Sequence, residues 1–305
     1  LSTRAGQAEG RRGRRRYREG FRAQVTTPAL ISLDSVQEWL QGNPQTPFPS
    51  TSNNLLTRMI AGVSAFAVTY LSRPIAPATF TETYNGNGHA QMMLRQQPII
   101  QVRSVTVDTT TVTARTQVGS FGYVADDAML YIDGGGLTVF GYGPPQMFSC
   151  GIQNVLVVYD AGYQTTATVV VPSGTPYTFD SDDLPQMWNT DRGVAYASTG
   201  TAFTLVTSAP SVAGTYQVTL GANGNAQYAF AAADAGASVV ITYGYTPGDV
   251  AQALIELVGE RVRTRDRIGE TSKNFGQQTT SFSQRDMNAN IKASLQQYRQ
   301  VAPIG

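Results

Sequence analysis

The chain has 305 residues, enough for one large hydrophobic core or two smaller ones. Charged residues make up only 14%, whereas glycine (30 residues) and tyrosine (15) are frequent, a composition that favours β structure. The single cysteine, Cys150, excludes an internal disulfide framework and fits assembly in a reducing cytoplasm. The single histidine, His89, excludes most histidine-based metal clusters and catalytic triads.

The net charge of +1 hides a strong asymmetry. Residues 1–25 hold eight arginines against Glu9 and Glu19, a net charge of about +6, and the remainder (14 bases, 19 acids) carries about −5. Such a basic arm can bind DNA phosphates, dock on an acidic protein surface or stay solvated. The candidate docking residues are Arg11, Arg12, Arg14, Arg15, Arg16 and Arg18. No apolar run reaches the roughly 18 residues that span a bilayer, so no membrane partner is expected.

Two helices are predicted after the arm. Ser32 is the expected N-cap of a short helix over residues 33–40, in which apolar residues recur at helical spacing. The second helix covers residues 55–71 with the same periodicity, and Pro74 ends it.

From Thr79 the apolar period changes to two, which predicts strands. The turn Asn85-Gly86-Asn87-Gly88 predicts a hairpin between residues 79–84 and 90–94. Further hairpins are expected for 99–107 with 110–118 and for 129–132 with 137–140. A strand over 155–159 closes this α+β unit.

Residues 164–245 predict a small β-sandwich or barrel inserted into that unit, because short strands alternate with turn signals. Its last strand, Val239–Tyr243, echoes Val155–Tyr159. An insert that leaves and returns through neighbouring strands has its two ends close together.

A long amphipathic helix begins at Pro247, with Asp249 in its first turn. Its apolar stripe is followed by arginines at alternate positions. These charges can face a DNA channel, pair with a neighbouring copy or remain solvated at the helix end, and we favour pairing between copies. The residues concerned are Glu256, Glu260, Arg261, Arg263, Arg265 and Arg267.

The C-terminal residues 272–283 are too polar for a core, and their two aromatics, Phe275 and Phe282, suit β-augmentation or insertion into a partner's pocket. A narrow stripe of Met287, Ile291, Leu295 and Tyr298 follows on a last short helix. Because a solitary helix of this length is marginal in water, we expect it to need a partner.

Catalytic chemistry has little support in the sequence. Asp180, Asp182 and Asp183 lack the glycine and terminal glutamate of a calcium loop, and Asp126 and Asp127 are interpreted as turn residues. The glycines at 134–136 lack the lysine and helix of a phosphate loop. We therefore expect no enzyme activity, no metal and no cofactor.

Several segments, in order, resemble phage head-to-tail adaptor proteins, the head–tail connectors of the HK97 type. They are Leu33–Leu40, the 55–71 helix with Arg73-Pro74-Ile75, Phe80–Gly86, Gln97–Val105, Asn154–Tyr163, Arg263–Gly269 and Leu295–Arg299. The resemblance covers about 27–163 and 246–300. Within the insert, Asp191–Val194, Ala213–Tyr216 and Tyr228–Gly236 resemble a small β-domain common in phage structural proteins.

The resemblance implies a virion neck protein at the unique capsid vertex, forming a ring of twelve copies under the portal and extending the DNA channel. It implies that double-stranded DNA passes without sequence-specific binding, and that the next neck or tail component (a stopper or tail terminator) binds below. It also implies that the C-terminal segment, with Phe275, Phe282, Met287, Ile291, Leu295 and Tyr298, contacts the portal protein. The major capsid protein is a further expected partner, and assembly is expected in the host cytoplasm.

The expected fold is α+β: a helical bundle of two N-terminal helices and the long C-terminal helix, with β-hairpins and an inserted β-domain. The expected divisions are the arm (1–25), the adaptor core (26–163 and 246–271), the insert (164–245) and a portal-docking segment (272–305). Two other functions remain open. The aromatic-rich insert is compatible with a tail or baseplate protein that binds a receptor or glycan. The arm is compatible with a DNA-packaging accessory protein.

Overall fold

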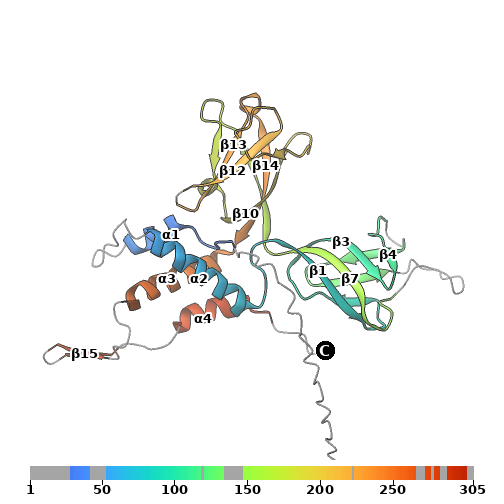
Figure 1. The fold of residues 1–305 in the computed structure, drawn as a ribbon, viewed down its shortest axis with the longest axis horizontal. Helices are drawn as coiled ribbons and strands as arrows, with labels where there is room; N and C mark the ends of the chain where they lie inside the picture. The colour runs from blue at the N-terminus through green and yellow to red at the C-terminus, as the bar shows by residue number, and fades with distance from the viewer. Residues whose placement is uncertain are drawn as a thin grey trace, which may run out of the picture.

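The structure, a computed structural model, describes residues 28–41, 53–117, 120–133, 147–221, 223–265, 272–275, 278–281 and 287–300. These residues form three lobes, each with its own hydrophobic cluster (Figure 1). We call them the helical lobe, the β-lobe (residues 78–161) and the insert (residues 164–246). The mixed α+β class is confirmed. The predicted adaptor core spans the first two lobes, and that grouping stays a prediction.

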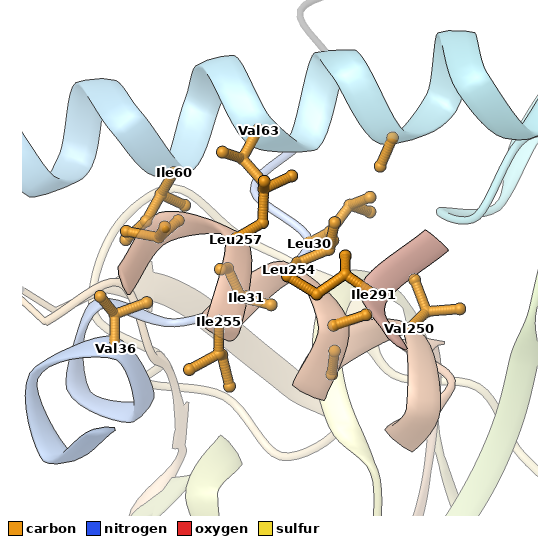
Figure 2. Close-up of a cluster of buried hydrophobic side chains, with 14 of the residues drawn as sticks. Leu30, Ile31, Val36, Ile60, Val63, Val250, Leu254, Ile255, Leu257 and Ile291 are labelled. Atoms are coloured by element: carbon orange, nitrogen blue, oxygen red, sulfur yellow. The ribbon is translucent and has the colours of Figure 1, made fainter. Parts of the chain in front are cut away.

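The helical lobe joins segments from both ends of the chain. Its four helices are α1 (Leu33–Gln41), α2 (Asn53–Leu71), α3 (Gly248–Arg265) and α4 (Ala289–Gln296). The predicted cap of α1 is confirmed, because the Ser35 amide donates to Ser32 Oγ at 3.2 Å. Figure 2 shows Ile60 and Val63 of α2 above Leu254 and Leu257 of α3, with Leu30 and Ile31 alongside. Helices that are distant in sequence therefore share one core.

Helix α2 is long and apolar enough to cross a bilayer by length and composition alone, with a mean hydropathy of 1.2. Core helices of globular proteins pass the same test. One face of α2, including Leu56, Val63 and Leu71, is buried in the cluster of the helical lobe. The absence of a membrane partner stays a prediction.

The β-lobe consists of two antiparallel sheets that enclose one cluster. Strand β7 (Gly151–Ala161) is an inner strand of the larger sheet, and Val155, Val157 and Tyr159 alternate inward while Leu156 is exposed. That sheet has the order β1 (Ala78–Gly86), β7 (Gly151–Ala161), β3 (Ile99–Val107), β4 (Thr110–Val112). The smaller sheet has the order β2 (Gln91–Met93), β6 (Met129–Asp133), β5 (Gly122–Ala125).

The predicted hairpin across Asn85-Gly86-Asn87-Gly88 is wrong. Strand β1 pairs with β7, and β2 pairs with β6 in the other sheet. Asn85 and Gly86 belong to β1, where Gly86 lies opposite Gly151, and the chain bends only at residues 88–90 before β2 joins the other sheet. The hairpin of β3 with β4 is confirmed, and β6 pairs with β5, whereas its predicted partner 137–140 lies outside the described residues.

The insert contains two sheets that enclose a third cluster, as predicted for a sandwich, and the described residues form no closed barrel. One sheet has the order β10 (Met187–Tyr196), β14 (Ser238–Thr246), β8 (Gln164–Val170). The other has the order β11 (Thr204–Leu205), β12 (Thr215–Leu220), β13 (Ala226–Phe230), β9 (Thr178–Asp180). Its ends meet as predicted, because Gly244 lies opposite Gln164 and the Tyr245 amide donates to the Tyr163 carbonyl at 3.0 Å.

Substitution of Leu254, which is fully buried on α3, tests whether the helical lobe depends on the returning helix. We expect Leu254→Ala to lower the free energy of unfolding by about 3 kcal/mol, because it leaves a cavity among α1, α2 and α4. Chemical denaturation followed by circular dichroism measures this. The matched control Val170→Ala, at a side chain that is 62% exposed, should change the free energy by less than about 0.5 kcal/mol. Equal effects would contradict the described core.

Candidate assembly surfaces and the lobe junction

The three lobes meet at three short segments, which we call the lobe junction. The Tyr163 amide donates to the Ile75 carbonyl at 2.9 Å, and Tyr163 in turn accepts from Tyr245. Backbone hydrogen bonds therefore tie the end of the β-lobe, the segment that leaves the helical lobe after α2 and both ends of the insert together. The junction consists of residues 75–79, 160–164 and 244–246.

Two glycines allow this close approach. A Cβ added at Gly244 would lie 2.3 Å from Pro77 Cδ and 2.5 Å from Asn189 Oδ1. Gly162 has a φ of +132°, and a Cβ there would lie 2.7 Å from Pro77 Cα. The junction therefore has no room for side chains at these two positions.

A buried carboxylate links the β-lobe to the insert at the same place. Asp160, at 1% exposure, accepts from Arg103 Nε at 3.0 Å and Arg103 Nη2 at 2.7 Å, both within the β-lobe. It also accepts from Arg192 Nη2 of the insert at 2.6 Å and from Thr79 Oγ1 at 2.6 Å. Both oxygens are thus satisfied by charged or hydroxyl donors, as a buried carboxylate requires.

The electrostatics of Asp160 favour the ionised form. Burial alone would raise the pKa of this carboxyl group, but the hydrogen bonds from Arg103 and Thr79 and the positive charges of Arg192 and Arg103 outweigh it. The pKa of Asp160 is therefore lowered. The sequence did not predict this site, because Arg103 lies 57 positions and Arg192 lies 32 positions from Asp160.

A second polar cluster lies inside the β-lobe. Glu82 Oε2 accepts from the hydroxyls of Tyr84 and Tyr159, the latter at 2.7 Å. Those hydroxyls accept from the amides of Arg95 and Gln96, each at 3.0 Å. Burial, strengthened by Glu82, raises the pKa of Tyr84 to about 12. Both tyrosines stay protonated near neutral pH, so the cluster anchors residues 95–96 rather than supplying a base.

The charged end of α3 lies partly against its own chain. Arg261 stacks over the Phe66 ring, with 5.5 Å between its guanidinium carbon and the ring centre, and Glu256 accepts from Gln252 at 3.0 Å. Glu260 is half-buried and Arg263 is exposed, and neither forms an ion pair with another described residue. Arg265 lies in the last turn, and Arg267 lies outside the described residues. Pairing between copies stays a prediction.

Helix α4 packs on the helical lobe of its own chain. Ile291 and Leu295 are at most 1% exposed in the cluster that includes α3, and Met287 and Tyr298 pack against it. The partner that this short helix needs is therefore α3. Ile291 and Leu295 are therefore available to a portal only if α4 leaves the core, whereas Met287 and Tyr298 are partly exposed. Portal binding by these four residues stays a prediction.

Between α3 and α4 the chain forms a β-hairpin. Strand β15 (Ser272–Phe275) pairs antiparallel with β16 (Gln278–Ser281), with Phe275 opposite Gln278. The two form a separate two-stranded sheet, which lies apart from the helices in Figure 1. Phe282 lies outside the described residues.

The other predicted features are placed as follows. Asp126 Oδ1 accepts from the amides of Ala128 and Met129, which confirms its role as a turn residue and lowers its pKa. Tyr216 and Tyr228 are buried in the insert, so they belong to its core rather than to a glycan-binding surface. The described residues contain no group of three or more His, Cys, Asp or Glu side chains arranged to hold a metal ion. The arm arginines, from Arg11 to Arg18, lie outside the described residues.

No family model and no curated protein matches this sequence. Among solved structures it is similar to a chain of the virion of a native gene transfer agent (GTA) particle, with 12% identity and a TM-score of 0.39 over 90% of this chain and 91% of that one. A chain of the neck of an empty GTA particle, with C6 symmetry, has 12% identity and a TM-score of 0.37 over 90% and 91%. A chain of the native GTA neck, with C12 symmetry, has 13% identity and a TM-score of 0.34 over 86% and 93%. TM-scores below 0.5 do not establish a shared fold.

Replacing the buried carboxylate with an amide tests the link between lobes. We expect Asp160→Asn to lower the free energy of unfolding by about 2 kcal/mol at pH 7, because charge-assisted hydrogen bonds are lost. The lowered pKa means that this contribution is complete above the unfolded pKa of about 4 and disappears as pH falls through the lower folded pKa. The difference between wild type and variant should therefore shrink below about pH 4.

Denaturation curves at a series of pH values measure this difference, with Asp127→Asn, at an exposed turn, as the control. A difference that does not depend on pH would contradict the charged network.

Shortening a side chain of α4 distinguishes a core helix from a free docking helix. We expect Leu295→Ala to lower the free energy of unfolding by about 3 kcal/mol, since Leu295 is fully buried. The exposed position Lys292→Ala on the same helix should have little effect. If both variants unfold like wild type, α4 is not part of the core and its apolar stripe is available to a partner.

Proposed function

We propose that this chain is a non-enzymatic structural protein of a phage-type virion neck: a ring-forming head-to-tail adaptor that joins the portal to the next neck or tail component. Twelve copies around the DNA channel are the expected number, formed through a head-to-tail interface that closes by rotation. Double-stranded DNA would pass through without sequence-specific binding. The proposal rests on the family resemblance and on the geometry of this chain.

The observation that carries the proposal is the hairpin β15–β16. An isolated two-stranded sheet is marginally stable in water, and both of its outer edges offer unpaired backbone groups to another strand. Its position between α3 and α4 attaches it at both ends to helices of one core. A hairpin held in this way suits β-augmentation by a partner and would transmit force to the helical lobe.

The geometry also limits which residues of the C-terminal segment we assign to the portal contact. Because α4 is committed to the core, the hairpin is the part of the C-terminal segment that we assign to the portal, with Phe275 and the adjacent Phe282 as anchors. The insert projects away from the helices in Figure 1. We assign it to the outside of the ring, where the major capsid protein or the next neck protein would contact it.

The alternatives are a glycan-binding tail protein and a DNA-packaging accessory protein. Burial of Tyr216 and Tyr228 removes two of the aromatic side chains on which the glycan hypothesis relies. The packaging hypothesis requires that the basic arm binds DNA, which would make the affinity fall steeply with salt.

Native mass spectrometry of the protein mixed with its cognate portal ring tests the proposal. We expect about twelve copies per portal for the wild type, and loss of binding when residues 272–281 are replaced by a glycine–serine linker of equal length. The linker keeps α4 attached, so the unfolding midpoint should stay close to that of wild type.

A glycine–serine replacement of residues 207–212, a loop of the insert, is the matched control and should bind normally. Absence of portal binding by the wild type would overturn the adaptor proposal. Normal binding by the hairpin variant would overturn only the assignment of the hairpin.

A further inference from the structure

A groove lies between the helical lobe and the insert, on the side of α1. It has a volume of about 530 Å³. Ile31 and Ile60 line it from the helical lobe, and Trp188, Val218 and Leu220 line it from the insert. The Leu220 side chain is 68% exposed at this groove. We call this cavity the α1–insert groove.

The groove contains a carboxylate that lacks a cationic partner. Asp191 lines the groove and accepts from the hydroxyls of Tyr216 at 2.8 Å and Tyr228 at 3.1 Å, but no described cation pairs with it. Asn189 also lines the groove, but its Oδ1 is buried at the lobe junction beside Gly244. A cationic occupant would complete Asp191.

Acidic side chains gather where α1 meets the insert. Asn225 Nδ2 donates to Asp34 at 2.8 Å and to Asp182 at 2.5 Å, and the adjacent Gly224 lines the groove. Burial, with the charges of Asp34, Asp180 and Asp183, raises the pKa of Asp182. None of these four carboxylates forms an ion pair with a described residue. The insert as a whole carries five acids and one arginine over residues 164–245.

We propose that the basic arm, residues 1–27 of the same chain, occupies the α1–insert groove. The arm joins the described chain at Pro28, which itself lines the groove. Its nearest apolar side chains, Phe21 and Val25, match the apolar walls, and Arg18 and Arg22 bring the positive charge that Asp191 lacks. Arginine has five N–H donors and no acceptor, so it complements a site lined and flanked by carboxylates.

Reach and charge both favour the chain's own arm as the occupant. Seven extended residues span about 24 Å, so Phe21 can cross the groove while attached at Pro28. A tethered segment has an effective concentration on the order of millimolar, which favours it over a free partner. The arm's net charge of about +6 is opposite in sign to the acidic residues beside the groove, so the two attract each other.

The docked arm would brace the insert against the helical lobe, in addition to the lobe junction. It would also occupy arginines that could otherwise bind DNA. This inference does not depend on the adaptor function, since it concerns contacts within one chain.

Crosslinking of the full chain tests the proposal. Cys150→Ser removes the native thiol, and Ala23→Cys with Leu220→Cys places one thiol on the arm and one at the groove. The matched control pairs Ala23→Cys with Ile152→Cys, at a side chain that is 87% exposed on the β-lobe. A short bis-maleimide should link the first pair within one chain at least tenfold faster than the control, as measured by peptide mass spectrometry.

Equal rates for the two pairs would overturn the proposal. Predominant links between chains would also overturn it, because the occupant would then be a neighbour's arm.

A charge variant tests the electrostatic part. Asp182→Asn combined with Asp183→Asn, both at exposed side chains, should slow intrachain crosslinking severalfold while the unfolding midpoint stays close to that of the parent. Raising the salt concentration should act in the same direction. An unchanged rate in both experiments would overturn the assignment of the arm to these acidic residues.

Discussion

The arrangement of the β-lobe and the insert depends on the buried carboxylate of Asp160. A charge taken out of water is costly unless cations and donors surround it, and here one arginine comes from the β-lobe and the other from the insert. Separating the lobes would leave Asp160 without part of that compensation. The insert could otherwise pivot, because only two chain segments connect it to the rest. The carboxylate, with the tight packing at Gly162 and Gly244, favours one orientation.

Local patterns in the sequence predicted the helices and most strands well, because periodicity reports which face is buried. They also predicted that the ends of the insert meet, as Tyr163 and Tyr245 now show. The pairing partners of the strands were harder to predict. The turn at residues 85–88 indicates a reversal, yet β1 pairs with β7, about 75 residues away, because that choice depends on burial in a sheet. The Asp160 network could not be predicted for the same reason, since Arg103 and Arg192 become neighbours only after folding.

The same distinction applies to the C-terminal segment. A narrow apolar stripe on a short helix predicts that a partner exists, but it does not identify the partner. For Ile291 and Leu295 the partner is α3 of the same chain. The hairpin between these helices is then the part of the segment that lies apart from the helices in Figure 1. Its backbone edges, rather than an apolar stripe, are the feature that we propose another protein recognises.

Separate hydrophobic clusters let the three lobes serve different contacts without sharing a core. Mutations at the surface of one lobe should then leave the other lobes folded, because sites that share no packing contacts act nearly independently. Electrostatics can still connect the lobes, since a mildly acidic body and a strongly basic arm attract one another within one molecule. That attraction weakens with salt, whereas the buried Asp160 network is screened much less. Ionic strength should therefore release the arm before it affects the orientation of the insert.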